Sequence, residues 1–402
     1  MTEAHDSLLL ATPDGLHRVQ STLREMGLDG WLLYEFREQN WISARLLGVQ
    51  HTTRRAFVLV PAEGEPRALI HAIEGSAWRH LDWPKRRYAG WRKLEEELAG
   101  LLRGAGRVAM EISPNDAVPT VDLVPAGVME LIAKTDAEPV SSGDLVSVFF
   151  SAWSEEQLVE HRKAAEVVAQ VAKDAFERAA DAIRRGSPTT EGALSDWIRA
   201  ELAARGVTVD LDTHVAVGAR AADPHYAPSG EGETIVRGEL LLIDLWGRTS
   251  EAAVSADQTW MGMMDDHVPD RVREVWDVVR EARDAAVRFL EERHAAGQEV
   301  RGWEVDAVSR AVVEEAGYGE HFFHRTGHSI DTKLHGSGPN LDNLESRDDR
   351  RLVTGVGFSI EPGIYLADDI GVRSEINVHY GADGPEVTPR EIQDEVFVLL
   401  GD

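Results

Sequence analysis

The sequence predicts an α/β protein built from two domains, and three observations lead to this prediction. A chain of 402 residues and 44.4 kDa is longer than one ordinary hydrophobic core supports. Hydrophobic residues make up 43% of the chain, which is enough for globular folding. Segments with helical spacing of apolar residues occur together with short apolar runs typical of strands. Helices and strands are partly segregated along the chain, so the expected class is α/β of the α+β kind.

Residues 1–153 are predicted to form the smaller domain. Leu16 to Gly27 has helical spacing and ends on a glycine that can cap a helix. Three short apolar runs are typical of strands; they are WLLYEF from Trp31, AFVLVPA from Ala56 and VAMEI from Val108. The segment from Pro139 to Trp153 is interpreted as the domain boundary.

Residues 154–402 are predicted to form the larger domain, which begins with a long helix. Ser154 and Gln157 have the spacing of a capping box, and Gly186 follows two arginines where the helix would end. A second helix is expected near Thr190 to Ala204, followed by an extended region from Val207 to Thr259. Two further helices and a strand-rich C-terminal region complete this domain, whose size of about 250 residues suits a single α/β enzyme domain.

Charge and composition exclude several classes of function. The net charge of −28 argues against nucleic acid or anionic membrane as a partner, because both require a basic surface. The chain has no cysteine, which excludes disulfides, zinc–thiolate sites and thiol nucleophiles. No apolar run approaches the roughly 20 residues of a membrane span, and the acidic N-terminus lacks a signal-peptide pattern. A soluble, cytoplasmic protein is expected.

Acidic residues stand in apolar surroundings where a solvated surface would not need them. Asp244 closes the apolar run from Leu240 to Ile243, and it is either a cap of the strand end or a ligand. Asp257 is equally ambiguous alone. Glu361 lies in an apolar run directly before Pro-Gly, so it either flanks a turn or is held rigidly at a strand end.

The segment GVRSEINVHY has the alternation of a strand. Val372, Ser374, Ile376 and Val378 point to one face, whereas Arg373, Glu375 and Asn377 point to the other. An exposed Arg–Glu pair would be unremarkable. If this face is instead inside, Glu375 must be paired or bound to a metal, and Arg373 is its natural partner.

Together these residues predict a metal site. The candidate ligands are four carboxylates and one imidazole: Asp244, Asp257, His328, Glu361 and Glu375. Such oxygen-rich sites suit a pair of divalent ions, Mn²⁺ first and Co²⁺ or Zn²⁺ as alternatives. Two ions roughly 3.5–4 Å apart are an arrangement used by hydrolytic enzymes. A GxSxG elbow, a phosphate-binding P-loop and an HExxH motif do not occur in the sequence.

The ordered motifs IDLWG, ADQTW, HRTGHSI with LHG, FSIEPGIY and GVRSE resemble those of the pita-bread metallopeptidases, among them methionine aminopeptidase, aminopeptidase P and Xaa-Pro dipeptidase (prolidase). The resemblance is strong from Ser154 to Asp402 and looser before it. It implies a C-terminal pita-bread domain preceded by a smaller creatinase/prolidase-like α/β domain. It also implies that Asp244, Asp257, His328, Glu361 and Glu375 bind two metal ions, with Asp257 bridging them.

The resemblance further implies roles around the metals. Glu361 doubles as the acid/base group, while His225 and His335 match histidines that act on the scissile bond. His324 and Arg373 match residues close to the substrate. Arg347 matches an arginine that holds the substrate's free carboxylate, although its charged segment ESRDDRR could simply be solvated.

Four departures from the family pattern leave these ligands intact. Asp244 and Asp257 are thirteen positions apart, two more than is usual, which predicts a longer hairpin. Trp260, Arg325 and Asp331 replace an arginine and two glycines of the family pattern. These changes bear on the shape of the pocket and on the length of the peptide that it accepts.

The expected function is a dinuclear-metal exopeptidase that hydrolyses the Xaa-Pro bond of dipeptides. The alternative is an Xaa-Pro aminopeptidase that acts on longer peptides. A metal-free binding protein or creatinase-like hydrolase on the same fold ranks below both, because all five ligand positions are filled. The expected partner is a small peptide with proline in second position, and the family implies a homodimer.

Overall fold

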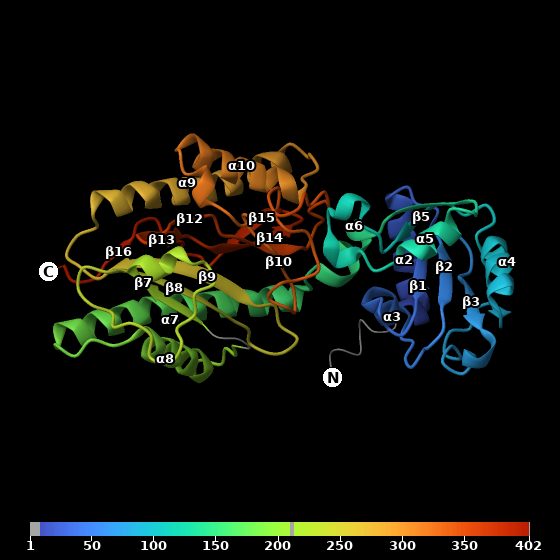
Figure 1. Cartoon of the computed structure of the whole chain (residues 1–402), viewed down its shortest axis with the longest axis horizontal. Coiled ribbons are helices and arrows are strands. Elements are labelled where there is room, and N and C mark those ends of the chain that lie inside the picture. The colour runs from blue at the N-terminus through green and yellow to red at the C-terminus, as the bar shows by residue number, and fades with distance from the viewer. Residues whose placement is uncertain (1–8, 210–212, 402) are drawn as a thin grey trace. The chain divides into compact units, whose positions relative to one another are not determined.

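The computed structural model describes residues 9–209 and 213–401; the first eight residues of the N-terminal segment considered above lie outside the described part. The chain divides into two compact units, Met1–Val146 and Ser147–Asp402. Both contain helices and strands, which confirms the predicted α/β class (Figure 1). Among the described helices none is long and apolar enough to cross a membrane.

The first unit is built on a mixed sheet of six strands in the order β4-β3-β2-β1-β5-β6. β1 pairs antiparallel with β2 and parallel with β5, so the three runs predicted as strands are neighbours in the sheet. The strands are β1 Gly30–Glu35, β2 Ala56–Pro61, β3 Arg67–His71, β4 Lys85–Tyr88, β5 Gly106–Met110 and β6 Ala137–Ser141. The α-helices are α2 Pro13–Glu25, α3 Trp41–Leu47, α4 Trp91–Leu101, α5 Ala126–Ile132 and α6 Gly143–Val146, with 3-10 turns at Leu9–Ala11, Ala72–Glu74, Pro114–Asp116 and Pro119–Val121.

A buried carboxylate joins three parts of this unit. Glu111 follows β5 and is fully buried. Its side chain accepts hydrogen bonds from the indole N–H of Trp31 at 2.6 Å and from the amide of Asn40 at 2.8 Å. Burial raises the pKa of Glu111 to about 7, and these hydrogen bonds only partly offset that rise.

We predict that the stability of the chain falls as pH rises through the range in which Glu111 ionises. Between about pH 4.5 and 7 the folded unit keeps a proton that the unfolded chain has released, so the free energy of unfolding decreases by about 3 kcal/mol. Glu111→Gln removes this ionisation, and urea unfolding at pH 5, 6, 7 and 8 should show a flatter pH dependence. Glu96→Gln removes the same charge from an exposed helix and should leave the slope as in the wild type. An unaltered slope in Glu111→Gln would contradict the prediction.

The second unit places its strands between two pairs of helices. Figure 1 shows α7 and α8 on one side and α9 and α10 on the other. The sheets have the orders β16-β9-β8-β7, β10-β11-β14-β15 and β12-β13. The helices are α7 Glu155–Arg184, α8 Glu191–Ala204, α9 Asp270–Ala295 and α10 Gly302–Glu315, with a π-helical turn at Ser147–Ser151 and 3-10 turns at Gly218–Ala222 and Gly319–His321. The strands are β7 His214–Val217, β8 Leu240–Gly247, β9 Ala256–Met263, β10 Ser329–Ile330, β11 Gly357–Ile360, β12 Gly363–Leu366, β13 Ile370–Arg373, β14 Ile376–Gly381, β15 Gly384–Thr388 and β16 Phe397–Val398.

The long helix α7 seals one face of the β8–β9 hairpin. The capping box predicted for its start is confirmed: the Ser154 hydroxyl accepts from the Gln157 backbone N–H at 3.2 Å, and the Gln157 side chain accepts from the Ser154 N–H at 2.9 Å. A Cβ on Gly262 of β9 would lie 2.6 Å from the ring of Phe176, so glycine is what allows helix and strand to approach. One face of the hairpin is therefore core, and polar side chains can gather only on the other.

Candidate metal centre

Strand register brings the candidate aspartates together on one face of the sheet. Residues of β8 alternate: Leu241, Ile243 and Leu245 belong to the core that includes α7. Asp244 therefore faces the opposite side, directly between His214 of β7 and Thr259 of β9 in the ladder. Asp257 lies on this same face of β9, two residues before Thr259. The eight residues between Gly247 and Ala256 form the connection of the hairpin.

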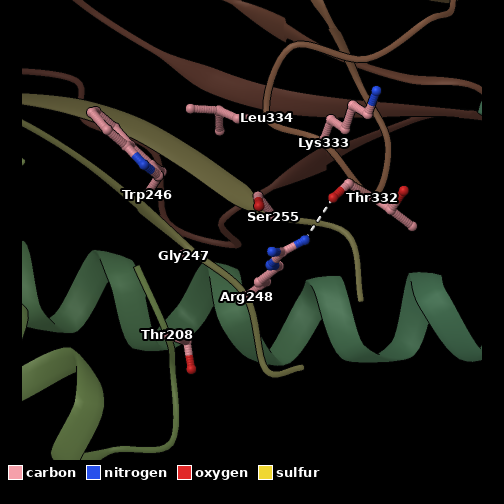
Figure 2. A pocket seen from close by; sticks show the side chains of 8 residues that line it. All are labelled: Thr208, Trp246, Gly247, Arg248, Ser255, Thr332, Lys333 and Leu334. Carbon is pink, nitrogen blue, oxygen red and sulfur yellow. Dashed lines mark hydrogen bonds between the residues drawn. The ribbon is translucent and has the colours of Figure 1, made fainter. Parts of the chain in front are cut away.

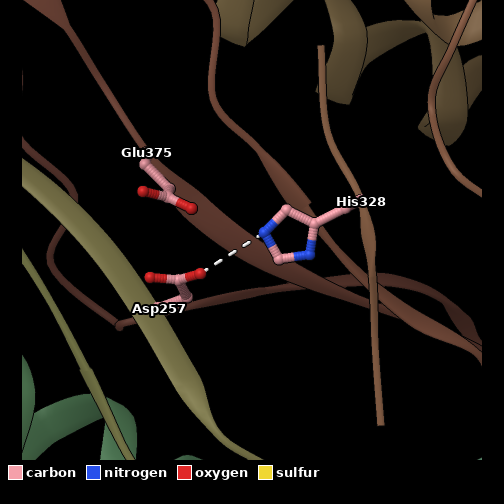
Figure 3. Close-up of side chains that lie close together, drawn as sticks. All are labelled: Asp257, His328 and Glu375. Atoms are coloured by element: carbon pink, nitrogen blue, oxygen red, sulfur yellow. Dashed lines mark ion pairs between the residues drawn. The ribbon is translucent and has the colours of Figure 1, made fainter. Parts of the chain in front are cut away.

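Three of the candidate ligands form a tight buried cluster. One ligand atom each from Asp257, His328 and Glu375 lies within 4.8 Å of the others, as Figure 3 shows. The side chains come from β9, from the residue that precedes β10 and from the turn between β13 and β14, and each residue is at most 5% exposed. His328 Nε2 is 3.4 Å from Asp257 Oδ2 and 3.5 Å from Glu361 Oε1, so a fourth candidate ligand adjoins the cluster.

Backbone contacts orient the His328 ring toward the carboxylates. Its Nδ1 lies 3.1 Å from the carbonyl oxygen of Ser329. Because a carbonyl only accepts, Nδ1 carries the hydrogen and donates it, which leaves the Nε2 lone pair facing Asp257 and Glu361. The preceding Gly327 lies so close to β11 that a Cβ would be 1.9 Å from the Ser359 carbonyl oxygen. The glycine of the sequence RTGHS therefore sets the position of the imidazole.

Arg373 and Thr259 connect the fifth candidate ligand, Asp244, to Glu375 of the cluster. Arg373 forms an ion pair with Asp244 Oδ2, and its Nε donates to the Thr259 hydroxyl at 2.9 Å. The Thr259 hydroxyl in turn donates to Glu375 Oε2 at 2.7 Å. His214 Nδ1 lies 3.3 Å from Asp244 Oδ2. Asp244 Oδ1 is buried and has no hydrogen-bond partner among the residues that the structure describes.

The electrostatics of this cluster show an excess of negative charge. Burial, and then repulsion from Asp257 and Glu361, raises the pKa of Glu375 well above its usual range. Burial likewise raises the pKa of Asp257 to about 6, although His328 partly opposes that shift. Burial alone would also raise the pKa of Asp244, but Arg373 and His214 outweigh it and hold that pKa low. One arginine thus neutralises only part of the group.

The donor set fits divalent cations. A hard or borderline ion requires oxygen and imidazole ligands. The cluster offers crowded carboxylates, one imidazole with its lone pair directed inward and an Asp244 oxygen without a hydrogen-bond partner among the described residues. Asp257, His328 and Glu375 would hold it, with Asp244 and Glu361 adjoining them.

Comparison with known proteins agrees with this geometry. Residues 160–381 match metallopeptidase family M24. An Xaa-Pro dipeptidase of Lactobacillus delbrueckii subsp. lactis is 36% identical over 323 residues, which is 79% of this chain and 79% of that protein. The chain belongs to metallopeptidase family M24. It is therefore a hydrolase of the peptidase class.

Other relatives extend the M24 comparison. An Xaa-Pro dipeptidase of Lactobacillus helveticus is 35% identical over 203 residues, which is 50% of each chain. The structure resembles dipeptidase PepE of Mycobacterium ulcerans with a TM-score of 0.64 and 23% identity, covering 96% of both chains. It resembles an Xaa-Pro dipeptidase of Bacillus anthracis with a TM-score of 0.57 and 21% identity, covering 96% of this chain and 99% of that one. These likenesses confirm the pita-bread fold with its N-terminal domain.

The remaining predicted residues of the M24 site lie at different places around the cluster. His335 packs edge-to-face on the ring of His328, with 4.4 Å between ring centroids. His324 Nδ1 donates to the Arg325 carbonyl at 2.7 Å, so its Nε2 accepts from the Tyr365 hydroxyl at 2.8 Å. The Tyr365 hydroxyl also accepts from Arg373 at 3.3 Å.

His335 is exposed, and so are two further predicted residues, His225 and Arg347. A hydrogen bond from Arg373 to the Pro224 carbonyl, at 3.4 Å, links the segment that carries His225 to the metal site. The His225 side chain itself is exposed to solvent. The Arg347 guanidinium lies over the ring of Trp303 at 4.5 Å. A role for Arg347 with the substrate carboxylate stays a prediction.

Sequence reasoning missed three residues of the site. Thr259 stands two residues after Asp257, and strand alternation could have placed it on the same face. Tyr365 closes the motif IEPGIY. Nothing in the sequence singles out His214, which reaches Asp244 only through the pairing of β7 with β8.

Two of the departures from the family pattern, Trp260 and Asp331, have local explanations. Trp260 lies on the face of β9 away from the site, where its ring stacks on Phe397. Asp331 is buried and accepts from the backbone N–H groups of Lys333 and Ser337, both at 2.8 Å. Asp331 therefore holds the loop that carries His335 rather than opening the site.

We predict that Mn²⁺ raises the unfolding temperature of the protein. An ion bound only by the folded state adds about 2.7 kcal/mol at a free concentration of 100 times its Kd, which corresponds to a rise of roughly 5–10 °C. Asp257→Asn should abolish this rise, measured by calorimetry with and without Mn²⁺ at pH 8, and the variant should still fold.

The control for this measurement is the other group of three possible ligands in the described chain, Asp265, Asp266 and His267. These residues are largely exposed, and Arg237 pairs with both aspartates. Asp266→Asn should keep the full Mn²⁺ effect. If Asp266→Asn loses the effect and Asp257→Asn keeps it, the buried cluster is not the metal centre.

Proposed function

We propose that the protein is an Xaa-Pro dipeptidase that uses two divalent ions, Mn²⁺ first among them. The observation that carries this proposal is the buried cluster of Asp257, His328 and Glu375, with Asp244 and Glu361 beside it, in a chain of family M24. The two Xaa-Pro dipeptidases of Lactobacillus support the substrate class.

Bound ions supply a Lewis acid for the scissile carbonyl and lower the pKa of bound water. The side chains of the protein do the rest. Glu361 adjoins His328 and is fixed by a hydrogen bond from the Ser359 hydroxyl at 3.0 Å, so it is held where it can take a proton and pass it to the leaving nitrogen. The prolyl nitrogen is that of a tertiary amide, and like any amide nitrogen it must be protonated to leave as an amine when the C–N bond breaks.

The two solvent-facing histidines are proposed to act on the carbonyl oxygen. His335 lies against His328, and His225 is close enough to His335 for their charges to interact. Partial burial is the largest cause of a lowered pKa of His335, to about 4. A neutral imidazole that donates one hydrogen bond can stabilise the developing oxyanion without repelling nearby metal ions.

Arg373 and Tyr365 are proposed to position the acidic groups. Arg373 holds Asp244 by charge and reaches Glu375 through Thr259. Tyr365 links Arg373 to His324, so the substrate side of the site and the ligands share one hydrogen-bond network. The network restricts the ligands to one arrangement before any ion binds.

We predict that the Mn²⁺-loaded protein hydrolyses Ala-Pro and Leu-Pro, and that a chelator abolishes this activity. Ala-Pro-Ala should be a poorer substrate by at least about tenfold in kcat/KM. Its proline carries an amide where the dipeptide carries a free carboxylate, so the group of the site that pairs this carboxylate is left without a partner. Release of proline or Pro-Ala, separated by chromatography, measures both reactions.

The same assay distinguishes the alternatives. Preference for Ala-Pro-Ala would replace the dipeptidase proposal by an Xaa-Pro aminopeptidase. Equal cleavage of Ala-Ala and Ala-Pro would show a dipeptidase without selectivity for proline. Activity that survives metal removal, verified by elemental analysis, would overturn the metal-dependent mechanism.

A further inference from the structure

A cavity of about 200 Å³ continues the metal-bearing face of β8 and β9 toward the tip of their hairpin (Figure 2). Trp246, which lines it, is paired directly opposite Asp257 in the ladder. Ser255, also in the lining, stands two residues before Asp257 and so shares its face. On the loop side, Leu334 immediately precedes His335. The cavity therefore adjoins the candidate metal centre both through the strands, at Asp257, and through the loop, at His335.

The described residues that line this cavity offer donors and positive charge. They include Arg248 and Lys333 and contain no acidic side chain, in a protein whose net charge is −28. Trp246 is 7% exposed, and its indole N–H has no hydrogen-bond partner among the described residues. A buried donor without a partner costs about 1–3 kcal/mol, so the indole favours an acceptor in the cavity. The hydroxyl of Ser255 adds a further polar group to the wall.

The two basic residues are held at the cavity by backbone contacts. Arg248 NH1 donates to the Thr332 carbonyl at 2.6 Å, which joins the hairpin to the loop on the other side, as Figure 2 shows. The Lys333 backbone N–H donates to Asp331 at 2.8 Å, and that carboxylate is engaged by Ser337 as well. Lys333 itself is an exposed residue of the loop.

The size of the cavity suits one group of a substrate. Sites for whole small-molecule ligands commonly occupy about 300–1,000 Å³, so a cavity of about 200 Å³ holds a side chain or a terminal group. The proline ring of an Xaa-Pro peptide is apolar and would leave the indole N–H unsatisfied. A carboxylate accepts several hydrogen bonds and carries the charge that Arg248 and Lys333 complement.

We propose that this cavity is a carboxylate-binding subsite of the metallopeptidase, formed by Trp246, Arg248, Ser255 and Lys333. The inference rests on the proposed function, because the carboxylate belongs to a peptide bound at the metal centre. Two groups of an Xaa-Pro substrate have this chemistry: the side chain of an aspartate or glutamate before proline, and the free carboxylate of proline.

The test compares kcat/KM for matched peptides with the Mn²⁺-loaded full chain. Glu-Pro against Gln-Pro isolates a side-chain carboxylate, and Ala-Pro against Ala-Pro-amide isolates the terminal carboxylate. The variant is Lys333→Met, which removes a charge from an exposed position and should not disturb folding. The matched control is Lys93→Met, on the exposed part of α4.

If the carboxylate comes from the side chain, Lys333→Met lowers the Glu-Pro to Gln-Pro ratio by roughly tenfold, the scale of one charged hydrogen bond. If it comes from the terminus, the ratio of Ala-Pro to Ala-Pro-amide falls instead. Trp246→Phe, which keeps an aromatic side chain but removes the pyrrole ring with its N–H, should lower kcat/KM for the same preferred peptide. Lys93→Met should change neither ratio. If neither ratio changes in Lys333→Met, the subsite proposal is wrong.

Failure of the proposed function has a different signature. If no Xaa-Pro peptide is hydrolysed by the wild type, calorimetric titration with glutarate still tests the subsite. Weaker glutarate binding in Lys333→Met, but not in Lys93→Met, would support a carboxylate subsite in an enzyme of another specificity. Equal binding in all three proteins would overturn it.

Discussion

The constraint on which this structure depends is the crowding of four carboxylates, of which Asp244, Asp257 and Glu375 are buried and Glu361 is partly buried. An unpaired carboxylate is costly in a low-dielectric interior, and like charges raise that cost further. Arg373 offsets part of it by pairing with Asp244. Burial, and then the repulsion that remains from Asp257 and Glu361, raises the pKa of Glu375 well above its usual range. Binding of a cation would therefore stabilise this group of carboxylates.

The fold makes this arrangement possible by sealing the other face of the same strands. α7 packs on β8 and β9 through small and aromatic side chains, so the hairpin cannot relax away from its crowded carboxylates. Local sequence signals were sufficient to predict this part. Ser154 and Gln157 mark the start of the helix, and apolar neighbours single out Asp244 and Glu361. Each of these signals lies within a few consecutive residues, which is the range over which periodicity and capping act.

Pairing between distant segments could not be predicted in the same way. Alternation in GVRSEINVHY places Arg373 and Glu375 on one face, but it does not say whether that face is buried. The structure shows that it is, because Glu375 meets Thr259 of β9, 116 residues earlier in the chain. His214 likewise meets Asp244 only through strand register. Register is set by the packing of whole strands, so no local pattern contains it.

The cavity beside the candidate metal centre has a strand wall and a loop wall, and the loop wall tolerates amino-acid substitutions more readily. Trp246 is fixed in the ladder opposite Asp257, so a change in its backbone position would move a candidate metal ligand. Lys333 and Leu334 lie on a loop whose shape depends on hydrogen bonds to Asp331 and on the close approach of Gly338 to Ser329. Side chains on such a loop can vary without disturbing the strands. In the proposed subsite, substrate preference can therefore change from the loop side, while the strand side keeps the candidate metal ligands in place.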